Sequence, residues 1–212
     1  MLLVRFLTAL LASLIVAAPA HAEETDETRR YGKFYNGAFV DVSARAGYQH
    51  VTSAPYRGVS WDVGIRQALV MHLLDTRLAF GEEHVSPRGD ADAQKLVVRS
   101  VGLSSAFHPL FMALLFSDWL GYLVASWYLE AGIGGQYATL DGGAQDDWGF
   151  RFHVGSGVDV PLTDPDRGWS FWLNSLYRFT WADFDFDSGA ELNLHHHGFF
   201  AGLSLRFNGL LF

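Results

Sequence analysis

Apolar side chains recur at every second position over most of the chain beyond residue 36. In segment 38–49, Val40 and Val42 share one face, whereas Asp41 and Ser43 share the other. Successive side chains of a β-strand point to opposite faces, so this period of two predicts strands. The pattern predicts eight of them, at 38–49, 58–69, 76–84, 95–107, 127–138, 148–160, 169–181 and 198–208, with 76–84 and 95–107 the weaker two.

Aromatic residues lie at the ends of the apolar faces. Trp127 and Tyr137 bracket one predicted strand, and Trp169 and Trp181 bracket another. An apolar band flanked by aromatic girdles is typical of strands that face lipid. The sequence therefore predicts an all-β fold, an eight-stranded antiparallel transmembrane β-barrel. A periplasmic sandwich or a lipocalin-like barrel is the alternative, in which the apolar face would form an internal core.

The opposite faces of these strands carry charged side chains. Eight strands enclose a space only wide enough for side chains to fill, and buried charges are costly unless they pair. We therefore expect a filled, non-conducting lumen rather than a gated ion path. The residues expected to line it are Asp41, Arg45, Asp62, Arg66, Glu130, Arg151, His153, Asp159, Arg178 and Arg206.

Segment 109–125 interrupts the period of two. It is apolar on nearly every face, and Pro109 suits the first position of a helix. We expect an interfacial helix on the periplasmic rim, or a helix and loop tucked against the barrel mouth. Two alternatives are a helix spanning the inner membrane, which the cost of inserting Asp118 opposes, and strands that extend through the segment.

The first 22 residues have the features of a secretory signal peptide. Arg5 precedes an apolar run from Phe6 to Ala18, and Ala20-His21-Ala22 is a small-x-small cleavage site. An uncleaved anchor helix is the alternative. We therefore divide the chain into a signal peptide at 1–22, a charged flexible leader at 23–35 and the barrel domain at 36–212.

The composition narrows the classes of function. Half of the residues are hydrophobic, 15% are aromatic and 18% are charged, which excludes an intrinsically disordered chain. The net charge of −8 argues against a nucleic-acid partner. The absence of Cys excludes disulfides, thiol catalysis and Cys-ligated metals.

Candidates for chemistry are weak. His153 and Ser156 are three residues apart, so a strand would place them on opposite faces. We therefore expect no enzyme, no catalytic residues and no cofactor. Carboxylates at Asp183, Asp185 and Asp187 precede imidazoles at His195 and His197, and the two groups would meet across a loop to hold Zn²⁺ or Ca²⁺. The alternating Asp and Phe residues also suit a polar strand rim, which we prefer.

Two motifs resemble a known family. Gly155-Ser156-Gly157-Val158-Asp159-Val160-Pro161-Leu162-Thr163 with Tyr177-Arg178-Phe179, and the ending Gly202-Leu203-Ser204-Leu205-Arg206-Phe207, resemble the last strands of small OmpA/OmpX/OmpW-like outer-membrane β-barrels. The resemblance covers about 147–207. It implies a monomeric, porin-like protein of the Gram-negative cell outer membrane. Its expected partners are outer-membrane lipid, lipopolysaccharide and the barrel assembly machinery. The expected role is structural or in surface contact; the alternatives are a lipid A-modifying enzyme and a narrow channel for small or hydrophobic solutes.

Overall fold

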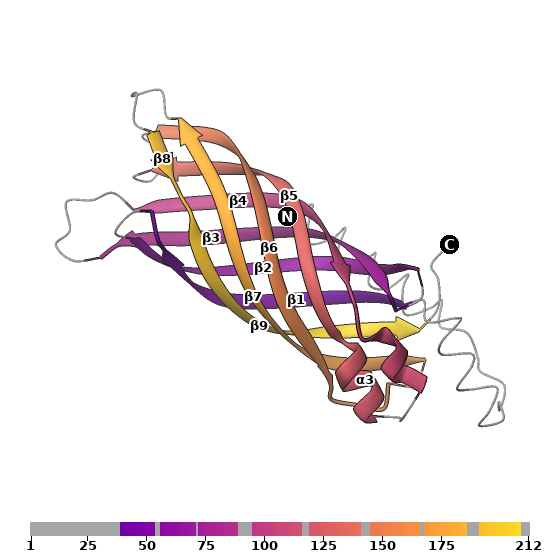
Figure 1. Cartoon of the computed structure of the whole chain (residues 1–212). Coiled ribbons are helices and arrows are strands. Elements are labelled where there is room, and N and C mark those ends of the chain that lie inside the picture. Colours follow the sequence, from indigo (N-terminus) through magenta and orange to yellow (C-terminus); the bar gives the residue numbers. More distant parts are fainter. Residues whose placement is uncertain are drawn as a thin grey trace, which may run out of the picture.

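Eight antiparallel strand positions close into a ring (Figure 1). The structure is a computed structural model that describes residues 39–53, 56–70, 72–88, 95–115, 119–140, 145–165, 168–185 and 191–208. The expected signal peptide, the leader and Asp187 lie outside these residues.

The strands are β1 (Phe39–Val51), β2 (Tyr56–Val70), β3 (Leu74–Pro87), β4 (Leu96–Phe107), β5 (Trp127–Leu140), β6 (Gln145–Pro161), β7 (Trp169–Asp185), β8 (Glu191–Asn193) and β9 (His196–Asn208). Each of the eight predicted strands is present.

The ring closes through β6 and β7 and through β1 and β9. Each strand from β1 to β6 pairs with the next, β6 pairs with β7, β7 pairs with β9, and β9 pairs with β1. Strand β8 continues β9, because both pair with β7 in one unbroken register, from Asp185 opposite Glu191 to Trp169 opposite Phe207. The ring therefore has eight positions, and each described strand position has a neighbour on both sides, as a membrane requires.

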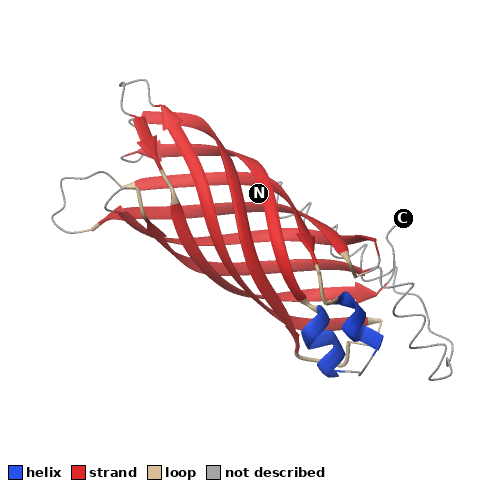
Figure 2. Ribbon diagram, viewed as in Figure 1, coloured by secondary structure: helices blue, strands red, loops and turns tan. Residues whose placement is uncertain are grey.

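The strand faces separate polar from apolar side chains. Along β7, Phe171 and Leu173 point outward and are exposed, whereas Ser170 and Asn174 point inward and are buried. Figure 2 shows the long barrel that these tilted strands form. Large apolar side chains thus cover the outside, which suits contact with lipid and excludes the sandwich alternative. No helix among the described residues is long and apolar enough to cross a membrane.

Two short helices close one end of the barrel. We call it the terminal end, because β1 begins and β9 finishes there, and the opposite end the loop end. Helix η1 (Phe111–Leu115) and helix α3 (Trp119–Ala125) lie at the terminal end (Figure 2). Leu114, Tyr122 and Ala125 pack against Trp172, which is 1% exposed. These helices form the cap.

The cap confirms the helix predicted near 109–125 and shows its form. The described part of this segment forms two short helices, η1 and α3, and the strands do not extend through it, because β4 ends at Phe107 and β5 begins at Trp127. The two helices fold back on each other, since Gly121 lets α3 approach η1: a Cβ there would lie 2.7 Å from the Ala113 carbonyl oxygen. Leu110, Met112 and Leu120 are exposed and continue the apolar exterior of the barrel.

Candidate functional site in the barrel lumen

The lumen holds equal numbers of opposite charges. Among the described residues, six carboxylates and six guanidinium groups are buried. All ten side chains expected to line the lumen are in the buried set, and none is more than 6% exposed. The twelve charged residues are Asp41, Asp62, Asp75, Glu83, Glu130 and Asp159 with Arg45, Arg66, Arg77, Arg151, Arg178 and Arg206. Because the charges balance, each can be offset by a neighbouring charge of opposite sign, as burial requires.

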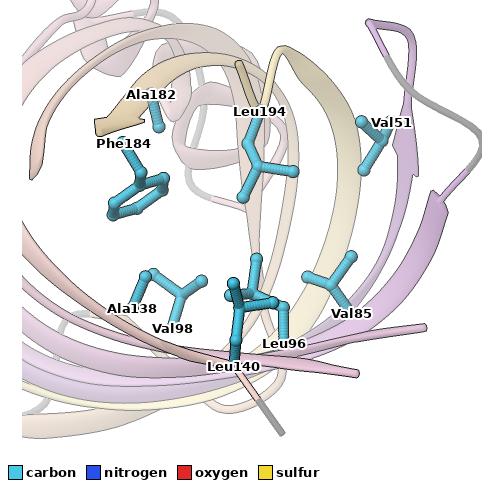
Figure 3. Close-up of a cluster of buried hydrophobic side chains, with 9 residues drawn as sticks. All are labelled: Val51, Val85, Leu96, Val98, Ala138, Leu140, Ala182, Phe184 and Leu194. Atoms are coloured by element: carbon cyan, nitrogen blue, oxygen red, sulfur yellow. The ribbon is translucent and has the colours of Figure 1, made fainter. Parts of the chain in front are cut away.

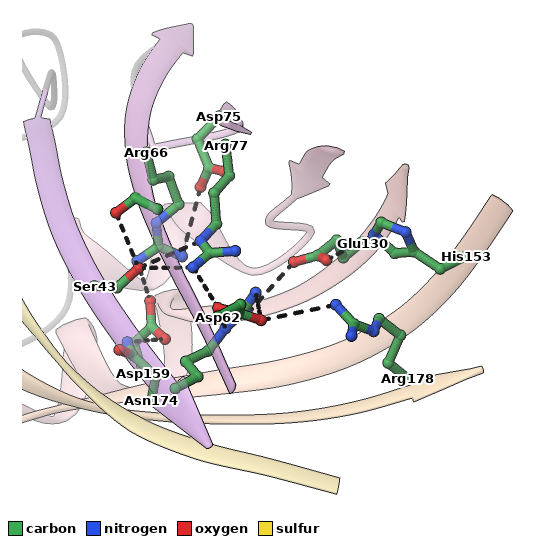
Figure 4. A network of polar contacts seen from close by, with 12 residues as sticks. Ser43, Asp62, Arg66, Asp75, Arg77, Glu130, His153, Asp159, Asn174 and Arg178 are labelled. Carbon is green, nitrogen blue, oxygen red and sulfur yellow. Dashed lines mark hydrogen bonds and ion pairs between the residues drawn. The ribbon is translucent and has the colours of Figure 1, made fainter. Parts of the chain in front are cut away.

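Asp62 is the centre of the middle layer (Figure 4). Arg45 Nε donates to Asp62 Oδ1 at 3.0 Å, and Arg77 Nη2 donates to the same oxygen at 2.6 Å. Arg178 Nη1 lies 3.9 Å from the other oxygen, Oδ2. One carboxylate therefore holds three guanidinium groups from three different strands.

Glu130 and His153 extend the middle layer. Arg45 Nη1 lies 3.9 Å from Glu130 Oε2, and His153 Nε2 lies 3.1 Å from Glu130 Oε1. The imidazole fits against β5 because residue 132 is glycine: a Cβ there would lie 2.5 Å from His153 Cε1. His153 is thus held by an ion-paired carboxylate and by the absence of a neighbouring side chain.

A second layer lies nearer the terminal end. Arg66 binds both Asp41, at 2.6 Å, and Asp159. Arg206 Nη2 lies 3.1 Å from Asp159 Oδ2, and Asn174 Nδ2 donates to Asp159 Oδ1 at 2.8 Å. These contacts join strands β1, β2, β6, β7 and β9 across the lumen.

The terminal-end layer connects to the cap. His108 Nε2 lies 2.8 Å from Asp75 Oδ2, and His108 Nδ1 lies 3.2 Å from the Ala125 carbonyl oxygen at the end of α3. In the turn after β2, His72 contacts the rings of Phe39 and Tyr122. Burial there, with a smaller effect of Arg206, lowers the pKa of His72 to about 3. This imidazole is therefore uncharged at neutral pH.

Toward the loop end, the charges give way to an apolar plug. Arg151 Nη1 lies 3.7 Å from Glu83 Oε1 and donates to Ser100 Oγ at 3.0 Å. Beyond this layer nine inward apolar side chains, each at most 7% exposed, form a cluster, and Figure 3 shows them arranged around the inside of the barrel on several strands. The plug consists of Val51, Val85, Leu96, Val98, Ala138, Leu140, Ala182, Phe184 and Leu194.

Several charged or polar residues of the lumen were not predicted from the sequence. Asp75, Arg77 and Glu83 all belong to β3, whose alternation is weak. The three residues lie at alternate positions of β3 and so share one face of the strand. That face points inward, because Arg77 pairs with the inward Arg66 and Asp75 pairs with Ala68. The spacing of these three charges was the available signal. His108 lies beyond the end of β4, where the period of two offers no information.

The residues considered as catalytic or metal-binding candidates do not lie together in the structure. Ser156 faces outward and accepts a hydrogen bond from Trp127 Nε1, whereas His153 points into the lumen. Among the loop residues that the structure describes, His195 contacts Asp183, while His197 contacts Tyr177. Within the described ranges, no three His, Asp or Glu side chains are grouped closely enough to hold a metal ion.

Comparisons with known proteins find similarities among solved structures alone. No protein-family model and no curated protein matches the chain. Solved structures do, at low identity. Neisserial surface protein A has a TM-score of 0.49 at 16% identity, over 81% of this chain and 97% of that one. The outer membrane protein AlkL has a TM-score of 0.40 at 12% identity, over 92% and 97%. The translocator domain of the autotransporter NalP from Neisseria meningitidis has 0.39 at 10% identity, over 85% and 92%.

The protein's own geometry gives the class. A closed ring of eight antiparallel strands satisfies its backbone without an edge, and its exterior is apolar while its charges are inside. The chain is therefore a small antiparallel β-barrel with the apolar exterior of a protein that spans a membrane.

Proposed function

We propose that the protein is a structural barrel whose lumen is filled and does not conduct. The observation that carries this proposal is the packing of the lumen, where twelve balanced charges are buried between an apolar plug and a helical cap. A permeating ion would have to break buried ion pairs, and unpairing a buried charge costs about 3–5 kcal/mol. Water would also have to wet the plug. Both barriers oppose conduction of ions and of small polar solutes.

Planar-bilayer recording tests the closed lumen. We expect the purified, refolded barrel to give no discrete conductance steps in 1 M KCl. A matched variant that shortens plug side chains at the loop end, Phe184→Ala with Leu194→Ala, should remain closed, because the ionic layers beneath are intact. Regular unitary steps from the unmodified protein would overturn the proposal and favour the narrow channel.

The outward face supports lipopolysaccharide as a partner. Near the loop end, His50, Arg57, Arg88 and Arg99 are exposed on neighbouring strands β1 to β4. Arg88 Nη2 lies 2.9 Å from His50 Nε2, and His50 is directly opposite Arg57 in the sheet. Guanidinium groups bind phosphate in bidentate fashion, and lipid A presents phosphates at this depth if the loop end faces the cell exterior.

A binding assay tests this contact. The variant Arg57→Gln with Arg88→Gln should bind lipopolysaccharide vesicles more weakly by about thirtyfold, because each of the two lost charges removes about 1 kcal/mol near an anionic surface. Arg57→Lys with Arg88→Lys keeps both positive charges and should bind much like the unmodified protein. Equal binding by all three would remove lipopolysaccharide recognition from the proposal.

We further propose that the protein is not an enzyme. Within the described ranges, His153 and His108 are buried and bonded to carboxylates, and Ser156 faces away from both. A nucleophile needs a base within hydrogen-bond reach. Mass spectrometry of lipid A from cells with and without the gene should show identical species. A missing or added acyl chain would establish the lipid A-modifying enzyme instead.

A further inference from the structure

Strands β6 and β7 part at the loop end. Their mutual pairing begins at Phe150 and Asp183, whereas β6 continues to Gln145 alongside β5, and β7 continues to Asp185 alongside β8. A cavity of about 650 Å³ lies where they separate. Residues 147–150 of β6, residues 183–185 of β7 and Asn193 line it. We call it the rim cavity.

Three carboxylates line the rim cavity. They are Asp147, Asp183 and Asp185. Within the described part of the chain, their partners are neutral or weakly basic: the Asp185 amide donates to Asp147 Oδ2 at 2.7 Å, and His195 Nε2 lies 3.3 Å from Asp183 Oδ1. No Lys or Arg among those residues pairs with them, in contrast to the balanced lumen. The rim cavity therefore carries surplus negative charge.

Aromatic rings form the rest of the wall. Trp148 and Phe150 are 73% and 63% exposed, more than any other large apolar side chain that the structure describes. Phe184, which also belongs to the plug, lies on the inner side. Aromatic faces attract cations, most strongly when the ring is indole, and quaternary ammonium groups are typical ligands of such walls.

We propose that the rim cavity binds an organic cation of the alkylammonium class. Its carboxylates offset the positive charge, and Trp148 and Phe150 contact the alkyl or aryl groups that the cation carries. A bare metal ion fits less well, because the described residues offer no group of three ligands and the volume exceeds that of one ion. This site lies outside the closed lumen and does not depend on it.

Titration with benzyltrimethylammonium tests the proposal in the full-length protein, folded in maltoside micelles. We expect saturable quenching of tryptophan fluorescence and a matching calorimetric isotherm, with benzyl alcohol, the uncharged probe, binding at least tenfold more weakly. Asp183→Asn with Asp185→Asn, and separately Trp148→Leu, should each weaken binding at least tenfold. The control is Asp146→Asn, which removes one carboxylate charge one residue outside the cavity, where Asp146 accepts a hydrogen bond from Tyr137; it should bind normally, whereas Asp183→Asn alone should already weaken binding.

Other outcomes of the titration would contradict the proposal or identify the source of the ligand. The proposal would be overturned if binding did not saturate, or if Asp146→Asn weakened it as much as the cavity variants do. It would also be overturned if the organic cation did not bind while Ca²⁺ bound both the unmodified protein and Trp148→Leu. Repeating the titration in phosphatidylcholine bilayers identifies the source of the cation. Competition there would show that a lipid headgroup occupies the site, whereas unchanged affinity would show that a soluble cation does, and both keep the same ligand chemistry.

Discussion

The guanidinium carbon of Arg206 lies 3.9 Å from the centre of the Trp172 indole ring, at the point where the ionic lumen meets the cap. The same guanidinium group contacts Asp159 and Asp41. Trp172 in turn meets Tyr122 of α3 edge-on. One arginine therefore couples the charge balance of the barrel to the packing of the helices that close it.

Replacing Arg206 tests this coupling. In Arg206→Met the side chain still covers Trp172, but Asp159 and Asp41 lose one of their two arginines. We expect the free energy of unfolding to fall by about 3–5 kcal/mol, because two buried carboxylates must then share the single arginine Arg66. Urea titration in lipid vesicles measures it. Arg57→Met, on the exposed outside, should cost within about 0.5 kcal/mol; equal losses for the two variants would contradict the assignment.

A methyl group at residue 132 should displace His153. A Cβ there would lie 2.5 Å from His153 Cε1 and 2.7 Å from Ser104 Cβ, so Gly132→Ala should destabilise the barrel by about 1–3 kcal/mol. Gly135→Ala is the matched control on the same strand, since nothing lies within 4 Å of its Cβ. Urea midpoints compare the two. The packing of His153 would be wrong if both variants behaved alike.

His108 should hold the cap to the barrel. His108→Leu removes the contacts to Asp75 and to the Ala125 carbonyl. Asp75 keeps Arg66 at 3.9 Å but loses its closer partner, and the Ala125 carbonyl loses its hydrogen bond, which costs about 1–3 kcal/mol. We therefore expect hydrogen exchange to quicken about tenfold or more at the Ser126 amide, which bonds Tyr122, and to stay unchanged in β1. His84→Leu, on the exposed face of β3, should alter neither region; protection of Ser126 in His108→Leu would refute the role.

The neutral His72 should make stability depend on pH. Its pKa is lowered to about 3 in the folded protein, whereas a free histidine titrates near 6.5. The folded state then binds fewer protons, so stability is complete above about pH 6.5 and declines as the pH falls toward 3. His72→Phe should lose less stability between pH 7 and pH 4.5 than the unmodified protein does. Parallel declines in urea midpoint would show that His72 contributes nothing.

Strand positions and the inward face could be predicted because both follow from local periodicity. Val40 and Asp41 reveal their opposite faces without knowledge of any partner strand. The partners of each charge could not be predicted in this way. Asp62 meets Arg45 and Arg77 through the register of neighbouring strands, and Arg178 across the lumen. Asp75 and Glu83 were not predicted as lumen residues, because apolar and polar residues alternate too weakly along β3 to show which of its faces points inward.

The sequence by itself determined that the chain forms eight strands with lipid on one side and charge on the other, because a period of two needs only the geometry of an extended backbone. Tertiary structure alone decided that six carboxylates balance six arginines, that β8 continues β9, and that 109–125 folds into two helices over Trp172. It also brought Asp147 and Asp185 together where β6 and β7 part. These features depend on strand register and barrel closure, which join residues far apart in sequence and leave no periodic trace in it.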